Sequence, residues 1–362
     1  MAEKYVSCIF LHLGVLLYLI SCSTADQTVP ALYVFGDSLV DVGNNNYLPL
    51  SIVKADFPHN GIDYPGKKTT GRFSNGKNAA DFIADKLGIP SAPPYLSQPN
   101  SIFPKGVNFA SGGAGIFNAT EGGIVEQTIS LAKQVAHFST VCGRLVQELG
   151  LTAAEEHLSK SLFPIVIGSN DIIGHFKSAS LDSNKTPPQQ YIALMLSTLQ
   201  QLLKGLHGLG GRKFLFVGLP PLGCAPKQRS LGNNKTDECN EQVNFWSNEY
   251  NRGFTQMLQR LKLELSDFHY SYFDTYSVFL DFIRNPAAYG FKEIKSACCG
   301  LGKLRAQVPC TPISQYCSNR GEYLFWDIYH PTEAAARSFV DAVFSGSGGY
   351  VSPITVQQLL AI

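Results

Sequence analysis

The sequence has no excess of charge of either sign. It contains 29 Lys and Arg residues and 28 Asp and Glu residues, so the formal net charge is only +1. It also has no run rich in Lys and Arg and no acidic tail. Surfaces that bind nucleic acid are normally strongly basic, so the charge pattern gives no reason to expect a nucleic acid as partner.

Nucleotide-binding motifs are missing as well. The glycine-rich stretch Gly112–Gly115 does not fit G-x-G-x-x-G, because Asn118 stands where the last glycine would be, and it has no Gly-Lys-Ser/Thr sequence. After residue 25 we find no internal repeat, low-complexity tract or linker-like segment. With 44% hydrophobic residues, the chain can bury a substantial core. We therefore expect one domain over residues 26–362.

Only one stretch of the sequence is both long and apolar, and it lies at the N-terminus. Lys4 supplies a positive charge, residues 8–22 are mostly apolar, and small residues lead up to Ala25. This pattern predicts a secretory signal peptide over residues 1–25. The alternative is an uncleaved membrane anchor, for which the apolar run is short. We therefore expect a secreted, extracellular protein without an integral membrane segment, the cell wall being one such location.

The residues after Ala25 also fit secretion. Asn118, Asn184 and Asn234 each begin an Asn-x-Thr glycosylation sequon. Cysteines remain at positions 142, 224, 239, 298, 299, 310 and 317. Four of them crowd into residues 298–317, and two of these are adjacent, which favours disulfides over the C-x-x-C spacing of a zinc site. An odd number leaves one free thiol, for which isolated Cys142 is our candidate.

Alternating strand-like and helix-like segments predict the fold class. Continuous apolar runs, typical of strands covered on both faces, occur at Leu32–Phe35, Val107–Ala110, Leu162–Ile167, Lys213–Val217 and Tyr270–Phe273. Helical patterns occur at Ala79–Leu87, Val125–Leu149, Tyr191–Leu209, Asn240–Leu265 and Glu333–Phe344. In the fourth of these we expect Phe245, Met257, Leu258, Leu261 and Leu265 to face the core. The order predicts an α/β fold, a three-layer α/β/α sandwich with a five-stranded parallel sheet.

Small polar residues and glycines come directly after three of the predicted strands. Gly36-Asp37-Ser38 comes after the first, Ser111-Gly112-Gly113 after the second, and Gly168-Ser169-Asn170-Asp171 after the third. In a parallel sheet these segments meet at the carboxyl edge, where such folds bind their ligands. Ser38 could then act as a nucleophile, with the backbone N–H groups of Ser38 and Gly112 and the side chain of Asn170 as oxyanion donors. The alternative for Asn170 is an ordinary turn residue.

A serine nucleophile needs a base, and His330 is the best candidate. His137, His157 and His207 fall in helical patterns, where a packing or surface role is expected. His330 instead lies in a turn before the last predicted helix, three residues after Asp327. That spacing places both side chains on one side of the turn, so Asp327 can hold one ring nitrogen of His330 while the other faces Ser38. The alternative for Asp327 is a helix-capping acid.

These segments together resemble the plant-type GDSL esterase/lipase family, within the SGNH hydrolases. The resemblance covers nearly the whole chain after the signal peptide. Its blocks are Phe35–Asn44, Gly71–Gly76, Gly106–Gly115, Ile167–Asp171, Gly218–Cys224 and Phe325–Pro331. It implies a flavodoxin-like SGNH hydrolase fold, with Ser38 as nucleophile, His330 as general base and Asp327 as its orienting acid. Asn170 and a glycine, for which we choose Gly112, are implied as oxyanion donors, with no metal or organic cofactor.

The resemblance leaves the substrate open. Residues 172–175, which are expected near the acyl pocket, depart from the aromatic and asparagine residues usual in the family. The predicted activity is hydrolysis of carboxylic esters by an esterase/lipase acting on a small-molecule, lipid or polymer ester. Acyl lipids, cutin-like polyesters, acetylated polysaccharides and phenolic esters all remain candidates. The alternatives are an acyltransferase with the same triad, a catalytically silent binding module, and a metal-dependent hydrolase, for which no paired His/Asp cluster is found.

Overall fold

The computed structural model describes residues 29–117, 127–177, 186–231, 236–346 and 348–362. The predicted signal peptide and the sequon residues Asn118, Asn184 and Asn234 lie outside these ranges. The described helices include none that is long and apolar enough to cross a membrane.

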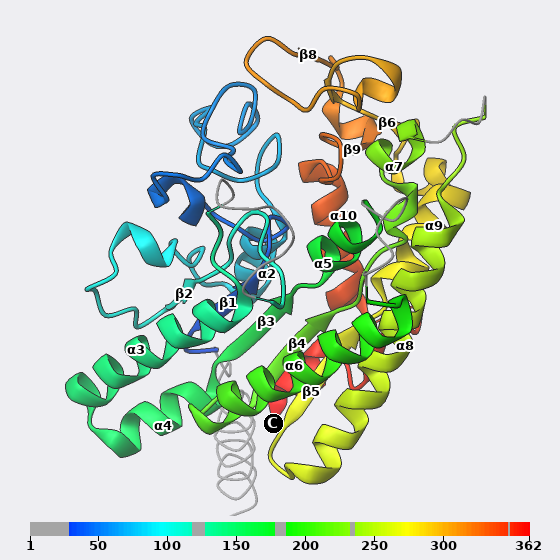
Figure 1. Ribbon diagram of the computed structural model, residues 1–362. Coiled ribbons are helices and arrows are strands. Elements are labelled where there is room, and N and C mark those ends of the chain that lie inside the picture. Colours follow the sequence, from blue (N-terminus) through cyan, green and yellow to red (C-terminus); the bar gives the residue numbers. More distant parts are fainter. Residues whose placement is uncertain (1–28, 118–126, 178–185, 232–235, 347) are drawn as a thin grey trace, which may run out of the picture.

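A six-stranded sheet forms the centre of the molecule (Figure 1). Its strands stand in the order β10-β5-β4-β3-β1-β2. They are β1 (Leu32–Gly36), β2 (Gly106–Asn108), β3 (Leu162–Val166), β4 (Lys213–Val217), β5 (His269–Phe273) and β10 (Val351–Pro353). The first five are parallel, as predicted, and β10 pairs antiparallel with β5 at the edge. The sequence did not reveal β10, which is only three residues long and ends in proline, a residue tolerated at sheet edges.

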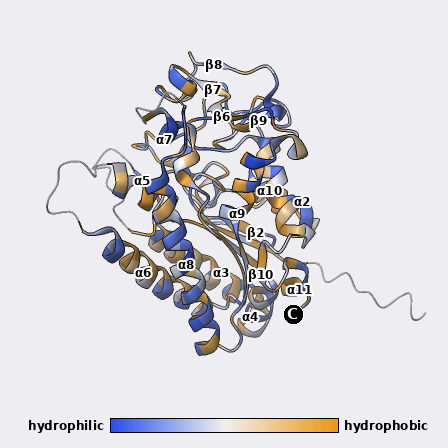
Figure 2. Ribbon diagram, turned by 90° about the vertical axis from the view of Figure 1, so that its right-hand side faces the viewer, coloured by the Kyte–Doolittle hydropathy of each residue, from blue (hydrophilic) through white to orange (hydrophobic). Residues whose placement is uncertain are grey.

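Helices cover both faces of the sheet, which confirms the predicted three layers (Figure 1). One face carries α3 (Leu131–Leu149), α4 (Leu151–Lys160), α6 (Pro188–Gly208) and α8 (Glu241–Glu264), and the other carries α2 (Ala79–Leu87), α9 (Thr275–Arg284), α10 (Glu333–Ser345) and α11 (Val356–Ala361). The shorter α5 (Ser169–Lys177) and α7 (Pro226–Leu231) come after β3 and β4 in the chain. Figure 2 shows hydrophobic and hydrophilic residues alternating along α6 and α8, as expected of helices with one buried side.

Two small sheets and several 3-10 helices complete the fold. β6 (Glu293–Ala297) pairs with β9 (Tyr323–Phe325), and β7 (Cys299–Gly300) with β8 (Gln315–Tyr316). The 3-10 helices cover Asn44–Tyr47, Tyr95–Ser97, Leu222–Cys224, Pro286–Tyr289, Lys303–Arg305 and Arg320–Glu322.

Helix ends differ from the sequence prediction where a capping residue decides them. α3 begins at Leu131 rather than at residue 125, because the hydroxyl of Ser130 accepts the N–H of Lys133 and starts the helix there. Asn240 likewise caps α8 instead of belonging to it. On α8, Phe245 is 54% exposed, so its predicted place in the core is wrong. No bounds were predicted for helix α4, although His157 in it was expected to be helical; Gly150, whose φ is +80°, separates α4 from α3.

The two faces of the sheet bury different kinds of side chain. The face toward α3, α6 and α8 is mainly aromatic, with Tyr33, Phe35, Phe163, Phe214, Phe216, Tyr270 and Tyr272. The face toward α2, α9 and α10 is mainly aliphatic, with Leu32, Val34, Leu162, Val166, Leu215 and Val217, and one ring, Phe273. This difference arises from strict alternation along each strand, since neighbouring residues point to opposite faces.

The disulfide prediction is confirmed in the structure. The bonds join Cys224 to Cys239, Cys298 to Cys317, and Cys299 to Cys310. Cys142 is the free, buried thiol that the odd count predicted. The zinc alternative for residues 298–317 is therefore wrong, because all four sulfurs there are bonded in pairs.

Candidate active site

Ser38 stands just beyond the carboxyl end of β1. The strand ends at Gly36, where a Cβ atom would lie only 2.4 Å from the carbonyl oxygen of Val166 on β3, so only glycine fits. The side chain of Gln134 on α3 receives the Gly36 N–H at 2.9 Å and donates to its carbonyl at 2.8 Å. The contacts of Gly36 with β3 and with Gln134 thus fix the backbone just before Ser38. Ser38 itself lines a cavity.

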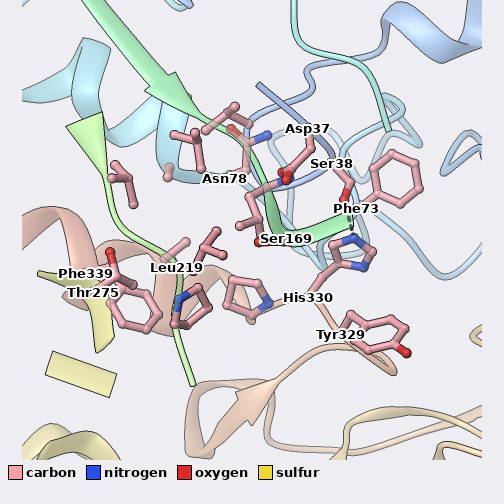
Figure 3. A pocket seen from close by; sticks show the side chains of 18 of the residues that line it. Asp37, Ser38, Phe73, Asn78, Ser169, Leu219, Thr275, Tyr329, His330 and Phe339 are labelled. Atoms are coloured by element: carbon pink, nitrogen blue, oxygen red, sulfur yellow. Dashed lines mark hydrogen bonds between the residues drawn. The ribbon is translucent and has the colours of Figure 1, made fainter. Parts of the chain in front are cut away.

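The predicted partners of Ser38 come together in one chain of hydrogen bonds. The Ser38 Oγ lies 2.7 Å from Nε2 of His330 (Figure 3). The other ring nitrogen, Nδ1, lies 2.8 Å from both carboxylate oxygens of Asp327. Ser38 and His330 are separated by 292 residues in the sequence, so tertiary folding alone brings them within bonding distance.

The turn that carries Asp327 and His330 is closed by its own hydrogen bonds. The N–H of Trp326 donates to the carbonyl of His330 at 2.8 Å. The carboxylate of Asp327 also accepts the N–H groups of Tyr329 and His330, at 2.9 and 2.8 Å. Phe73 lies against the imidazole, with its ring centroid 5.0 Å from that of His330. The imidazole therefore has little freedom to turn away from Ser38.

Burial and mutual attraction set the charges of Asp327 and His330. Burial raises the pKa of Asp327, but the positive charge and hydrogen bond of His330 outweigh it, so the pKa lies below its usual value. For His330, burial lowers the pKa while Asp327 raises it, and the net pKa lies above the ordinary 6.5. The carboxylate thus stays ionised and makes His330 a stronger base than a free histidine.

The predicted role of Gly112 does not agree with its contacts. Its N–H donates to a carboxylate oxygen of Asp41 at 2.9 Å. This N–H is therefore already hydrogen-bonded to the loop that follows Ser38. Asp41 also accepts the N–H groups of Gly43 and Asn44, at 2.7 and 2.8 Å. Gly113, rather than Gly112, lines the cavity beside Ser38.

Asn170 lies in the first turn of α5 and not in a loop, and its side chain lines the same cavity. Its amide nitrogen donates to the carbonyl of Ala114 at 2.9 Å, and the amide group carries a second N–H. The carboxylate of the next residue, Asp171, accepts the N–H of Ile116 at 3.0 Å. These bonds tie the start of α5 to the glycine-rich segment after β2, which fixes the position of Asn170.

Sequence reasoning missed several residues that shape this site. Gln134 looks like a surface residue in a helical pattern, yet it is fully buried against Gly36. Asp37 is buried beside Ser38, and one of its carboxylate oxygens has no hydrogen-bond partner within the described residues. Burial raises the pKa of Asp37 to about 7. In the sequence, only the position of Asp37 next to Ser38, in Gly-Asp-Ser, indicated that it belongs to the site.

The remaining histidines of the helical patterns serve packing or the surface, as expected. His137 stacks on Tyr95 with ring centroids 4.6 Å apart. His157 contacts the hydroxyl of Tyr33 at 3.1 Å, and His207 pairs with Asp267. In the described parts of the chain, no group of three or more His, Cys, Asp or Glu side chains is arranged to hold a metal ion.

A cavity of about 510 Å³ extends from Ser38 and His330 into the molecule (Figure 3). Such a volume suits an organic ligand, since ligand pockets commonly measure about 300–1,000 Å³. Of the segment 172–175, Ile173 and Gly174 line the cavity, whereas His175 stacks on Tyr191 and Ile172 belongs to the aromatic core.

Comparison with known proteins identifies the family. Residues 32–343 match the sequence model of the family described as GDSL-like lipase/acylhydrolase. A GDSL esterase/lipase of Arabidopsis thaliana is 51% identical over 344 residues, which cover 92% of this chain and 90% of the relative. Another from the same plant is 40% identical over 324 residues, covering 89% of this chain and 90% of the relative.

An α/β hydrolase named LAE5, from the metagenome of Lake Arreo in Spain, aligns with a TM-score of 0.41 and 13% identity, covering 88% of this chain and 95% of the other. The family match and the plant relatives span nearly all of the described sequence, including each segment that meets at Ser38. The chain belongs to the GDSL lipase/acylhydrolase family, a family of carboxylic ester hydrolases.

Proposed function

We propose that this chain is a secreted esterase/lipase that cleaves carboxylic esters with Ser38, His330 and Asp327. The observation that carries the proposal is the unbroken hydrogen-bond chain from Ser38 Oγ through the His330 imidazole to the Asp327 carboxylate. Each distance in it is 2.7 or 2.8 Å, within reach for proton transfer. The oriented imidazole and the cavity beside it are the parts that acyl transfer requires.

The reaction runs in two half-reactions. Ser38 Oγ attacks the ester carbonyl carbon while its proton passes to Nε2 of His330, and the carbonyl oxygen becomes an oxyanion. The C–O bond to the alcohol then breaks, and His330 returns its proton to the departing oxygen. A water molecule, deprotonated by His330, attacks the acyl-Ser38 carbonyl carbon, and the acid leaves as Ser38 regains its proton. Asp327 stays ionised throughout and stabilises the imidazolium.

The oxyanion needs donors next to Ser38. We propose the backbone N–H of Ser38, the side-chain amide of Asn170 and the backbone N–H of Gly113. Gly113 takes the place of Gly112, because Gly113 lines the cavity and Gly112 does not. Donors held by rigid backbone stabilise the developing charge without having to reorganise.

Asn170→Ala is expected to lower kcat for ester hydrolysis by about 100- to 1,000-fold while KM changes little, because one oxyanion donor is lost. Steady-state kinetics with nitrophenyl butyrate measure both constants. Asn170→Asp keeps the size and the acceptor oxygen but lacks the N–H donor, so it should be as inactive as the alanine variant. A kcat within threefold of wild type in a folded Asn170→Ala protein would contradict the assignment.

The pH dependence of the reaction is set by the raised pKa of His330. A protonated imidazole cannot accept the Ser38 proton, so kcat/KM is expected to fall as the pH drops through this pKa. Because Asp327 raises it above 6.5, the acid limb should lie above that value. A pH profile of nitrophenyl butyrate hydrolysis measures the midpoint. A midpoint clearly below 6.5 would show that His330 is not the titrating base.

Secretion is part of the proposal. It is supported by the signal-like residues 1–25, by the Asn-x-Thr sequons and by the three disulfides, which persist mainly in oxidising compartments. Nothing in the charge pattern favours nucleic acid, and we propose an ester as the binding partner. Finding the mature protein in the extracellular fluid, with an N-terminus near residue 26, is the expected outcome of expression in plant cells.

The test of the activity is nitrophenyl butyrate turnover by the purified, disulfide-bonded chain. Steady release of nitrophenol and butyrate, unchanged by a metal chelator, is the expected result. Transfer of the butyryl group mainly to an added alcohol, rather than to water, would make the protein an acyltransferase. If the folded protein does not hydrolyse the ester, the proposal of a general esterase is wrong, and a binding role is favoured.

A further inference from the structure

We propose that the cavity between the aliphatic face of the sheet and helix α10 binds the acyl chain of the ester, so that the preferred substrates are esters of medium- to long-chain fatty acids. This inference rests on the proposed function, since Ser38 must be the site of acyl attachment. It adds where the acyl chain lies and which residues set its length.

The cavity leads away from Ser38 along one side of α10. His330 and Pro331 precede this helix, and Ala336, Phe339, Val340 and Val343 on it line the cavity. Their spacing of three and four residues makes one continuous stripe. From Ala336 to Val343 the stripe measures about 10 Å along the helix axis, at 1.5 Å per residue. Figure 3 shows Phe339 at the opposite end of the cavity from Ser38.

The sheet forms the opposite wall of the cavity. Val166, Leu215, Val217 and Phe273 line it, all of them on the aliphatic face. Val217 is half-buried, although β4 lies in the middle of the sheet with strands on both sides. Its accessible surface therefore faces the cavity. Short aliphatic side chains leave space here, whereas rings fill the other face of the sheet.

The chemistry of the walls selects an apolar chain. Asp37, Ser38, Ser169 and His330 gather at one end of the cavity, near the reacting atoms (Figure 3). At the other end, beside Phe339, Thr275 is the polar residue that Figure 3 labels. Along the stripe of α10 and the sheet wall, the lining residues are alanine, valine, leucine and phenylalanine. A sugar or an acetyl group would leave this apolar surface without contacts. Each methylene of a fatty acyl chain that is buried here makes binding more favourable, because its apolar surface leaves water.

The order of the reaction favours the acyl chain over the alcohol in this position. The acyl group stays bonded to Ser38 through both half-reactions, so it can remain buried while water enters. The alcohol must leave before water attacks, and it receives its proton from His330. The cavity next to His330 is lined by the half-exposed Ile328 and Tyr329 and the exposed Pro309, which offer a route outward.

Val217→Phe tests the proposal by placing a ring where the acyl chain would pass. We expect kcat/KM for nitrophenyl dodecanoate to fall by about tenfold or more relative to nitrophenyl acetate, because displacing even one methylene from an apolar pocket costs about 10- to 200-fold. The acetate rate serves as the internal reference, because an acetyl group has only two carbons and β3 separates β1, which precedes Ser38, from β4, which carries Val217. Leu194→Phe, at an exposed position of α6 on the other side of the sheet, is the matched control and should leave the ratio unchanged.

Ala336→Leu provides a second obstruction on the opposite wall, in case Val217→Phe does not fold. An unchanged dodecanoate-to-acetate ratio in folded Val217→Phe and Ala336→Leu proteins would overturn the proposal. So would a loss confined to esters of long alcohols with acetic acid, because the cavity would then hold the alcohol. If the wild type hydrolyses neither nitrophenyl ester, the proposed function fails instead, which separates the two claims.

Discussion

Ser38→Ala is expected to lower kcat for nitrophenyl butyrate by about 10⁶-fold, because loss of the nucleophile removes the covalent route altogether. The residual rate would come from the oxyanion donors and from substrate binding, which remain intact. Ser38 is buried, but alanine differs from serine only by the missing hydroxyl, so it should fit there without unfolding the chain.

Ser169→Ala is the matched control for this variant. Ser169 lines the same cavity and is as buried as Ser38, at 9% exposure, but the hydroxyl that meets His330 is that of Ser38. We expect Ser169→Ala to keep kcat within a few-fold of wild type. Comparable losses in both variants would mean that the serine hydroxyls of the cavity act through structure and not through nucleophilic attack.

Asp327→Asn is expected to lower kcat by about 10⁴-fold. The Asp327 carboxylate accepts the Nδ1–H of His330, which leaves Nε2 free of a proton and able to take one from Ser38. An asparagine amide can donate to Nδ1 instead, which favours the wrong tautomer of the imidazole. It also removes the charge that raises the pKa of His330. The residual activity should therefore show an acid limb at lower pH than in wild type.

The shift of the acid limb distinguishes an electrostatic role of Asp327 from a structural one. Asp341→Asn, on the exposed side of α10, makes the same chemical change away from the cavity and should alter neither the rate nor the pH profile. An Asp327→Asn variant with near-wild-type kcat would show that His330 is oriented by other contacts, such as the ring of Phe73.

The sequence carried enough information to predict the residues that meet at Ser38. Ser38 comes directly after an apolar strand pattern, and the loops at the carboxyl ends of parallel strands lie at one edge of the sheet. Asp327 and His330 are three residues apart in one turn, so their contact is local. Such features depend on short stretches of chain, and the five parallel strands were predictable for the same reason.

Other features depend on contacts between distant segments and left no local pattern. Gln134 reaches Gly36 across 98 residues, and Asp41 takes the N–H of Gly112 across 71 residues. The sequence therefore could not reveal that Gly112 is already engaged and that Gly113 lines the cavity. The cavity itself is lined by residues of α10 and of three strands, β3, β4 and β5, so no single segment determines it.

Trapping the nucleophile is the most direct test of the central claim, that Ser38 attacks because His330 and Asp327 activate it. A fluorophosphonate ester loses fluoride when a serine oxygen bonds to its phosphorus, and peptide mass spectrometry locates the adduct. We expect a single rapidly formed adduct, on Ser38, and a much slower one on Ser38 in the His330→Ala protein. Rapid labelling of another residue, or equally fast labelling of Ser38 without His330, would contradict it.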